Sequence, residues 1–218
     1  MIWIKHALDR LLAGVALIIL SPVMLIAAVG IKVSSRGPVF YMAQRMGKDL
    51  QPYTMYKFRT MRVNTDKEGA ITSAHDNRIF PWGNILRKIK IDELPQLINI
   101  LSGTMSIVGP RPEDINIVNK YYTDKEKETL KVLPGLACPG SIFNYTHGEY
   151  YLKDENTENA YVNELMHIKL ALDLYYLEHW NLLYDIRIVF RTLYVIFVTS
   201  FTKRKADYPV EYKRLFKV

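Results

Sequence analysis

The sequence predicts an α+β fold that is mostly helical, with an N-terminal membrane anchor joined to one small domain. Three features predict it: an apolar run from Leu11 to Val33, two short segments of β character after Pro38, and later stretches with helical periodicity. Roughly 180 residues follow the anchor, which is enough for one compact domain with its own core but few for two. We therefore expect an anchor over residues 1–36 and one domain over residues 37–218.

The apolar run is long enough to cross a bilayer as a helix, but Ser21-Pro22 lies in its middle. Because proline removes a backbone hydrogen bond, the helix should break there, and the serine hydroxyl can bond a freed backbone group. Basic residues at both ends give the positive-inside rule no direction, so we expect the chain to re-enter the leaflet it left. A kinked span is the alternative. A secretory signal peptide fits poorly, because the run is too long and no small-residue cleavage site follows it. The basic residues are Lys5, His6 and Arg10 before the run, and Lys32 and Arg36 at and after its end.

The chain carries a net charge of +7 and a single cysteine. A basic balance indicates an anionic partner, which can be phospholipid headgroups, a phosphorylated substrate or nucleic acid. One cysteine, Cys138, excludes an internal disulfide framework and a cysteine zinc site, which suits a reducing compartment.

Two segments after the anchor, residues 38–47 and 52–61, have the composition of short strands joined by a polar turn. Lys57 and Arg59 lie two residues apart in the second segment, so both should project from one face of the strand. Such a pair usually marks a solvated face, and ligand contact is the alternative. The polar residues 64–77 are expected to form a loop.

Helical periodicity begins near Ile85 and continues in three stretches. The apolar positions 94, 97, 98 and 101 recur at helical spacing and stop at Ser102-Gly103, a typical C-terminal boundary. Residues 161–180 predict a second helix and residues 182–201 a third. The third is amphipathic and has too short an uninterrupted apolar portion to cross a bilayer, so it should lie in the headgroup plane or pack on the domain.

Two adjacent carboxylates, Asp92 and Glu93, stand among cations. Asp92 is predicted to cap the following helix, with Glu93 in its first turn, which is the ordinary structural role of such acids. Arg87 and Lys90 precede the pair and Arg111 follows between two prolines, so backbone N–H groups and cations together indicate a phosphate site. The same cations should keep Asp92 ionised. An ionised carboxylate beside phosphate can hold a divalent metal or attack phosphorus, and two carboxylates can divide those roles.

The chain resembles the bacterial sugar transferase family, the monotopic polyprenyl-phosphate phosphoglycosyl transferases, from Lys5 almost to Phe201. The resemblance rests on the Ser21-Pro22 break and on GPVFYMAQRMG, YKFRTM, LRKIKIDELPQLINILSGTMSIVGPRPE and LALDLYYLEHWNLLYDIRIVFRT, in the family's order. It implies an enzyme embedded in one leaflet of the bacterial inner membrane by a re-entrant anchor. Residues 37–218 would then form a catalytic domain on the cytoplasmic face.

The resemblance also implies a reaction and the residues that perform it. A UDP-sugar would give its phospho-sugar to polyprenyl phosphate, with undecaprenyl phosphate as the expected acceptor, through an aspartyl intermediate and with release of UMP. Asp92 would be the nucleophile, and Glu93, together with Asp92, would hold Mg²⁺. The candidate phosphate and substrate contacts are Lys57, Arg59, Arg78, Arg87 and Arg111.

Two stretches depart from the family's usual pattern. Ile89 and Lys90 stand where relatives commonly have Thr-Ser, which changes the polarity beside the carboxylates. Residues 136–151 replace a segment that helps form the nucleotide-sugar pocket in relatives, and its expected arginine is missing. The identity of the donor is therefore open. His147 and Glu149 can serve in that segment, although a loop histidine is more often structural.

Two other classes of function compete with the enzyme. A catalytically silent membrane scaffold that binds nucleotide sugars or partner enzymes is one alternative, and the intact Asp92-Glu93 pair argues against it. A nucleic-acid binder is the other, and the chain has no clustered basic helix or recognisable reading motif, so no nucleic acid is expected. The transferred sugar, the glycan pathway and the formation of a homodimer are left open.

Overall fold

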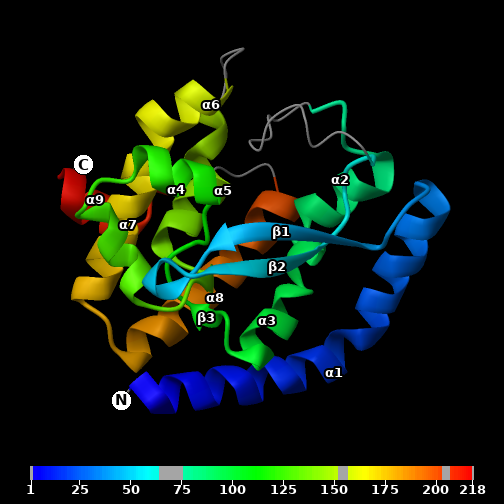
Figure 1. Ribbon diagram of the computed structural model, residues 1–218, viewed down its shortest axis with the longest axis horizontal. Helices are drawn as coiled ribbons and strands as arrows, with labels where there is room; N and C mark the ends of the chain where they lie inside the picture. The colour runs from blue at the N-terminus through cyan, green and yellow to red at the C-terminus, as the bar shows by residue number, and fades with distance from the viewer. Residues whose placement is uncertain (1, 64–75, 152–156, 203–206, 218) are drawn as a thin grey trace.

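The protein is described here by a computed structural model that covers residues 2–63, 76–151, 157–202 and 207–217 (Figure 1). Its first element is the helix α1, Ile2–Ser34, which curves along one side of the molecule. Pro22 lies inside this helix, and the Ser21 hydroxyl donates to the carbonyl of Ile18 at 2.8 Å. Pro22 has no backbone N–H to donate to that carbonyl, which lies four residues earlier. The prediction that the serine hydroxyl bonds a backbone group freed by the proline is therefore confirmed. The predicted break is wrong in form, because α1 is one continuous helix that bends.

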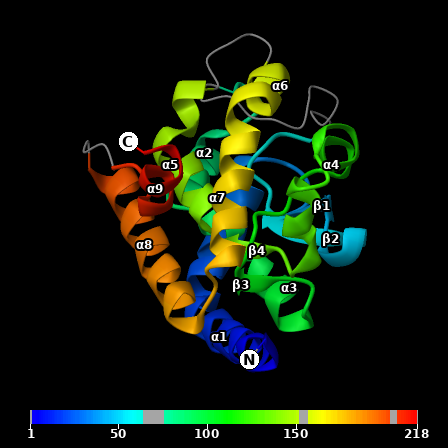
Figure 2. The same ribbon diagram turned by 90° about the vertical axis from the view of Figure 1, so that its left-hand side faces the viewer.

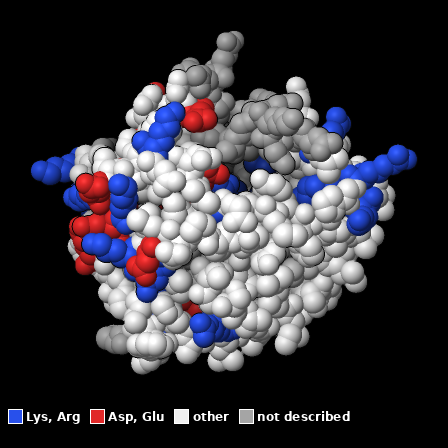
Figure 3. Space-filling view, viewed as in Figure 1, with Lys and Arg blue, Asp and Glu red and all other residues white. Residues whose placement is uncertain are grey.

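One face of α1 packs on the domain and the other is open. Lys5, Asp9, Ala13, Ala27 and Ile31 are buried along its length. The open face carries large apolar side chains, among them Trp3, Leu11, Ile18, Leu25 and Val33. Within the described residues, α1 is the single helix long and apolar enough to cross a membrane. In the space-filling view, the surface along α1 has few charged side chains (Figure 3).

The predicted strands are confirmed as an antiparallel hairpin of β1, Phe40–Met46, and β2, Pro52–Phe58. The polar turn between them is a 3-10 turn at Lys48–Leu50, in which Asp49 and Leu50 have positive φ of 54° and 59°. A second sheet was not predicted: β3, Ser106–Val108, pairs in parallel with β4, Gly135–Ala137. Each of its strands has only three residues, too few to show an alternating pattern.

The remaining chain is helical, and the helices cover the two small sheets. The α-helices are α2 Pro81–Lys88, α3 Gln96–Ser102, α4 Ile115–Tyr121, α5 Pro139–Tyr151, α6 Thr157–Ala160, α7 His167–Glu178, α8 Leu182–Phe201 and α9 Val210–Phe216. Further 3-10 turns occupy Ile91–Glu93 and Glu126–Lys131, and a π-helical turn at Tyr161–Met166 leads into α7. Most of the predicted loop at 64–77 lies outside the described residues.

Three helix predictions are confirmed and one interpretation is wrong. α3 ends at Ser102 before Gly103, whose φ is 82°, and α7 and α8 match the second and third periodic stretches. The segment read as a loop around His147 is the helix α5. Its Gly140 and Gly148 weakened the helical signal, but α5 packs against α7 and its Phe143 is fully buried in the largest core cluster.

The amphipathic helix α8 follows α7 after a short turn. The two helices run apart from one another beyond that turn (Figure 2). Ile188 and Val195 of α8 are buried in a core cluster with Tyr176 of α7. Phe190 and Phe197, on its other face, are 69% and 60% exposed. The helix therefore packs on the domain, which confirms one of the two alternatives predicted for it. Its other face is apolar and exposed.

Candidate active site

The two adjacent carboxylates lie in a tight reversal between α2 and α3. Lys90 adopts the left-handed conformation, with φ 58° and ψ 19°, and Ile91–Glu93 form a 3-10 turn directly after it. The N-cap position of α3 is Pro95, and no side chain accepts a capping hydrogen bond there. The prediction that Asp92 caps the helix is therefore wrong, because the 3-10 turn separates the carboxylates from the first turn of α3.

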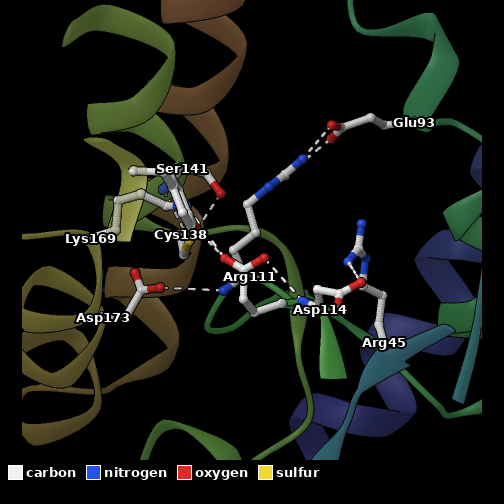
Figure 4. Close-up of polar contacts among 10 residues, drawn as sticks. Arg45, Glu93, Arg111, Asp114, Cys138, Ser141, Lys169 and Asp173 are labelled. Carbon is white, nitrogen blue, oxygen red and sulfur yellow. Dashed lines mark hydrogen bonds and ion pairs between the residues drawn. The ribbon is translucent and has the colours of Figure 1, made fainter. Parts of the chain in front are cut away.

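Glu93 is surrounded by donors. Arg111 reaches it with both guanidinium ends, Nη2 to Oε1 at 2.5 Å and Nη1 to Oε2 at 3.3 Å (Figure 4). Lys57 Nζ lies 3.5 Å from Oε1, and the Tyr145 hydroxyl donates to Oε2 at 3.3 Å. Burial alone would raise the pKa of Glu93, but the charges of Arg111, Lys57 and Lys90 hold it well below the ordinary value. Glu93 is therefore an ionised carboxylate whose two oxygens both have partners.

Asp92 differs from Glu93 in its hydrogen-bond partners and in the direction of its pKa shift. Its side chain is buried, and its Oδ1 has no hydrogen-bond partner among the described residues. Burial and the charge of Glu93 raise the pKa of Asp92, while Lys57, Lys90 and Arg87 oppose the rise. Desolvation therefore outweighs the cations in setting the direction of this shift, and the expectation that the cations keep Asp92 ionised stays a prediction. Of the two carboxylates, Asp92 is therefore the one with an oxygen that has no partner among the described residues.

Of the predicted cations, three lie near the carboxylates. Lys57 and Arg111 contact Glu93 directly. Arg87 acts on Asp92 through its charge, and its guanidinium lies 3.5 Å from the Thr60 hydroxyl.

The other two predicted cations are engaged elsewhere. Arg59 donates to the carbonyls of Ser35 at 2.8 Å and Pro38 at 2.6 Å, which fixes the chain that leaves α1. It does not share the Lys57 surface, because β2 ends at Phe58 and strand alternation stops there. Arg78 binds Asp76 through Nε and Nη2. Their roles toward phosphate stay predictions.

The profile of the bacterial sugar transferase family matches residues 1–199. The chain belongs to this family. The resemblance drawn from the sequence motifs is thereby confirmed.

Characterised relatives share about a third or more of the sequence. A UDP-N-acetylgalactosamine-undecaprenyl-phosphate N-acetylgalactosaminephosphotransferase of Aeromonas hydrophila is 36% identical, over 93% of this chain and 45% of that protein. A UDP-glucose:undecaprenyl-phosphate glucose-1-phosphate transferase of Escherichia coli is 38% identical, over 90% of this chain and 41% of that protein. This chain therefore spans less than half the length of these two relatives. The exopolysaccharide production protein ExoY of Sinorhizobium fredii is 34% identical, over 87% of this chain and 83% of that protein.

Of the two carboxylates, Asp92 suits a bound Mg²⁺, whereas the oxygens of Glu93 are already paired with cations. Mg²⁺ usually binds through one or two carboxylates, with water and substrate phosphates completing its shell. The unpaired Oδ1 of Asp92 suits that role, whereas Glu93 shares its oxygens with Arg111 and Lys57. No cluster of three or more His, Cys, Asp or Glu occurs within the described part of the chain. Any Mg²⁺ here would thus need the oxygens of the substrate.

Two residues of the site were missed from the sequence. Tyr145 of α5 contacts both Glu93 and Arg111. Asp173 of α7 accepts from the backbone N–H of Gly140 at 2.9 Å and from that of Arg111 at 3.3 Å, and the second contact is drawn in Figure 4. Burial raises the pKa of Asp173 to about 6. The sequence signal that could have identified Asp173 is an acidic residue within an otherwise apolar stretch of a predicted helix. No local sequence pattern identifies Tyr145.

His147, proposed for the donor pocket, packs in α5 instead. It is buried and its ring stacks on Tyr208 at 3.9 Å between centroids, which is a structural contact. The side chain of Glu149 lies outside the described part of the structure.

Proposed function

We propose that this protein transfers a phospho-sugar from a nucleotide diphosphate sugar, most simply a UDP-sugar, to undecaprenyl phosphate or a similar polyprenyl phosphate. The observation that carries the proposal is the unequal pair of carboxylates. Glu93 is saturated by cations and a hydroxyl, whereas Asp92 keeps a buried oxygen without a partner. Family membership and the activities of the two phosphotransferase relatives support the same reaction.

In the proposed reaction, an oxygen of Asp92 attacks the β-phosphorus of the UDP-sugar. A bond forms between Asp92 and phosphorus, and the bond from that phosphorus to the bridging oxygen breaks. UMP leaves with the bridging oxygen and the electron pair. An oxygen of polyprenyl phosphate then attacks the same phosphorus, which frees the Asp92 carboxylate and yields a polyprenyl-diphosphate-linked sugar.

Two of the cations have a defined role in this proposal. Arg111 and Lys57 neutralise Glu93, so that a negative diphosphate can approach the carboxylate pair. Asp92 would hold Mg²⁺ together with oxygens of the diphosphate, and Glu93 would join it only by exchanging a contact with Arg111 or Lys57 for the ion. When bound, the ion offsets the repulsion between an anionic nucleophile and the phosphates.

We also propose that α1 anchors the protein in one leaflet of the inner membrane, with the domain on the cytoplasmic face. The support is that α1 contacts the domain along its whole length. Lys5 pairs with Asp185 at 2.6 Å near one end, Ala13 is buried in the middle, and Ala27 and Ile31 are buried near the other end. A helix held in this way cannot cross to the opposite side without the domain. Its apolar open face suits lipid, which would place Asp92 within reach of an acceptor phosphate at the headgroup level.

The proposal is tested by UMP release from a panel of UDP-sugars, with Mg²⁺, undecaprenyl phosphate and the purified protein in detergent. Asp92→Asn should lower the rate by ~10³-fold or more, because an amide cannot form the acyl-phosphate. Asp124→Asn, a change at a fully exposed carboxylate, is the matched control and should leave the rate unchanged.

The covalent step is tested separately by rapid quenching with donor labelled in the sugar. Labelled phospho-sugar should remain on the native protein and be absent from Asp92→Asn. Undiminished turnover in Asp92→Asn would remove Asp92 as nucleophile. Turnover of the native protein without trapped label would replace the two-step reaction with direct transfer.

A further inference from the structure

Lys90 has an unusual backbone conformation for its residue type. Its φ of 58° and ψ of 19° lie in the left-handed region, which glycine adopts without the steric cost that a lysine incurs. Strained backbone of this kind is concentrated at ligand sites, where the side chain justifies it. Glycine would adopt this backbone conformation at a lower energetic cost than lysine. A function of the Lys90 side chain would account for the lysine at this position.

The side chain of Lys90 reaches across to α5. Its ammonium lies 4.0 Å from the centroid of the Tyr145 ring, a cation–π contact. The hydroxyl of the same tyrosine bonds Glu93 and accepts from Arg111 at 3.1 Å. The ring therefore fixes the ammonium beside the carboxylate pair, and the pKa values of Asp92 and Glu93 both respond to its charge.

Tyr145 is itself held by a buried brace. Asp173 accepts from the backbone N–H groups of Gly140, at the start of α5, and of Arg111. A Cβ on Gly140 would lie 2.8 Å from the Asp173 carboxylate and from the Lys169 carbonyl, so the approach of α5 to α7 requires glycine. The helix that carries Tyr145 is thus tied to the loop that carries Arg111.

Lys90 differs from its neighbours in having no acidic partner. Lys57 and Arg111 both form ion pairs with Glu93, whereas no ion pair joins Lys90 to an acid within the described ranges. The residue as a whole is half-buried. A cation that is positioned by a ring and not neutralised by a carboxylate is suited to an anionic ligand.

We propose that Lys90, held over Tyr145, is a binding residue for the diphosphate of the donor. The inference rests on the proposed function and deepens it by naming a phosphate subsite.

The subsite is tested by titration calorimetry of the full chain in detergent, with Mg²⁺ and either inorganic pyrophosphate or UDP as probe. Lys90→Gln should raise the Kd of both probes by ~10-fold or more, the loss expected for one charge-assisted contact. Lys120→Gln is the matched control, because Lys120 also lies over a tyrosine ring, that of Tyr121, but on the exposed surface of α4. It should leave both Kd values within ~2-fold of the native values.

Two further changes separate binding from folding. Lys90→Gly relieves the left-handed strain, so its melting temperature should equal or exceed the native value while its Kd rises as in Lys90→Gln. Tyr145→Leu removes the ring and should raise the Kd by ~5-fold, whereas Tyr145→Phe keeps the ring and should have a smaller effect. Native Kd values in Lys90→Gln, or in Tyr145→Leu, would overturn the proposal.

UMP release distinguishes the failure of the subsite from the failure of the proposed function. If the native chain releases UMP and Lys90→Gln does so with an unchanged KM, the subsite is wrong and the function stands. If the Lys90 variants lose pyrophosphate binding but the native chain releases no UMP from any UDP-sugar, the function is wrong and the anion subsite stands.

Discussion

At the scale of single residues, neighbouring carboxylates acquire opposite properties from their contacts. Glu93 has its pKa held low by Arg111, Lys57 and Lys90, while Asp92, one residue earlier, has its pKa raised by burial and by Glu93 itself. Divergent pKa values in one pair are the usual sign that two acids have different tasks. Here the low-pKa member is paired with cations, and the high-pKa member has an oxygen without a partner among the described residues.

A pH prediction follows from the raised pKa of Asp92. The proposed nucleophile must be ionised, so kcat/KM should fall on acidification at a pH above 3.8, the ordinary value for aspartate. Lys57→Met removes a cation that lowers the pKa of Asp92, so the acid limb should move to higher pH. The measurement is UMP release between about pH 4 and 8.

Lys120→Met is the control for that experiment, because Lys120 is exposed on α4 and should leave the acid limb in place. A profile that is flat down to the ordinary aspartate value, or a Lys57→Met profile shifted to lower pH, would contradict the assignment.

At the scale of elements, close packing positions the site. Gly83 of α2 lies against the chain after β2, where a Cβ would stand 2.3 Å from the Thr60 carbonyl. That contact sets the path of α2, and α2 leads through Arg87 and Lys90 to the carboxylate pair. The packing of Gly83 against Thr60 therefore connects the hairpin to the site, and there is no room for a side chain at residue 83.

Gly83→Ala should destabilise the protein and reduce its activity together. The added methyl group meets rigid backbone, so we expect a loss of about 1–3 kcal/mol in the free energy of unfolding, typical of overpacking. Asn84→Ala, at the next and exposed position of the same helix, is the control and should be neutral or slightly stabilising. Thermal melting in detergent and UMP release measure the two effects. Native stability in Gly83→Ala would show that α2 can shift without loss.

At the scale of the whole molecule, a curved apolar helix forms one side of the protein (Figure 1). Its inner face carries buried groups such as Lys5 and Ile31, and its outer face carries exposed residues such as Trp3 and Ile18. This division suits a helix that lies between the domain and lipid better than one surrounded by lipid. The topology can be measured because the only cysteine, Cys138, is buried and its thiol has a raised pKa.

Cysteines placed near the two ends of α1 should be labelled from the same side of the membrane. Trp3→Cys, at a residue that is 84% exposed, and Ser34→Cys, at an exposed residue, serve for this. With a membrane-impermeant maleimide, both should react in inside-out vesicles and neither in right-side-out vesicles. The native chain is the control, since a buried thiol of raised pKa should not react. Labelling from opposite sides would establish a span.

The sequence by itself determined the elements that local patterns encode. Apolar length marked α1, and the serine hydroxyl beside Pro22 was expected to bond a freed backbone group. Composition and a polar turn marked the hairpin, helical spacing marked α3, and apolar composition gave the bounds of α8. Motifs in a fixed order identified the family, because they depend on residue identity and spacing alone.

Only the tertiary structure decided how the site is assembled. Tyr145 and Glu93 are 52 positions apart and Asp173 and Arg111 are 62, and no local pattern encodes such contacts. The burial of Asp92 and the lack of a partner for its Oδ1 among the described residues likewise depend on what surrounds the turn. Local propensity sets where helices and strands form, whereas desolvation and the pairing of charges are set by atoms that folding brings together.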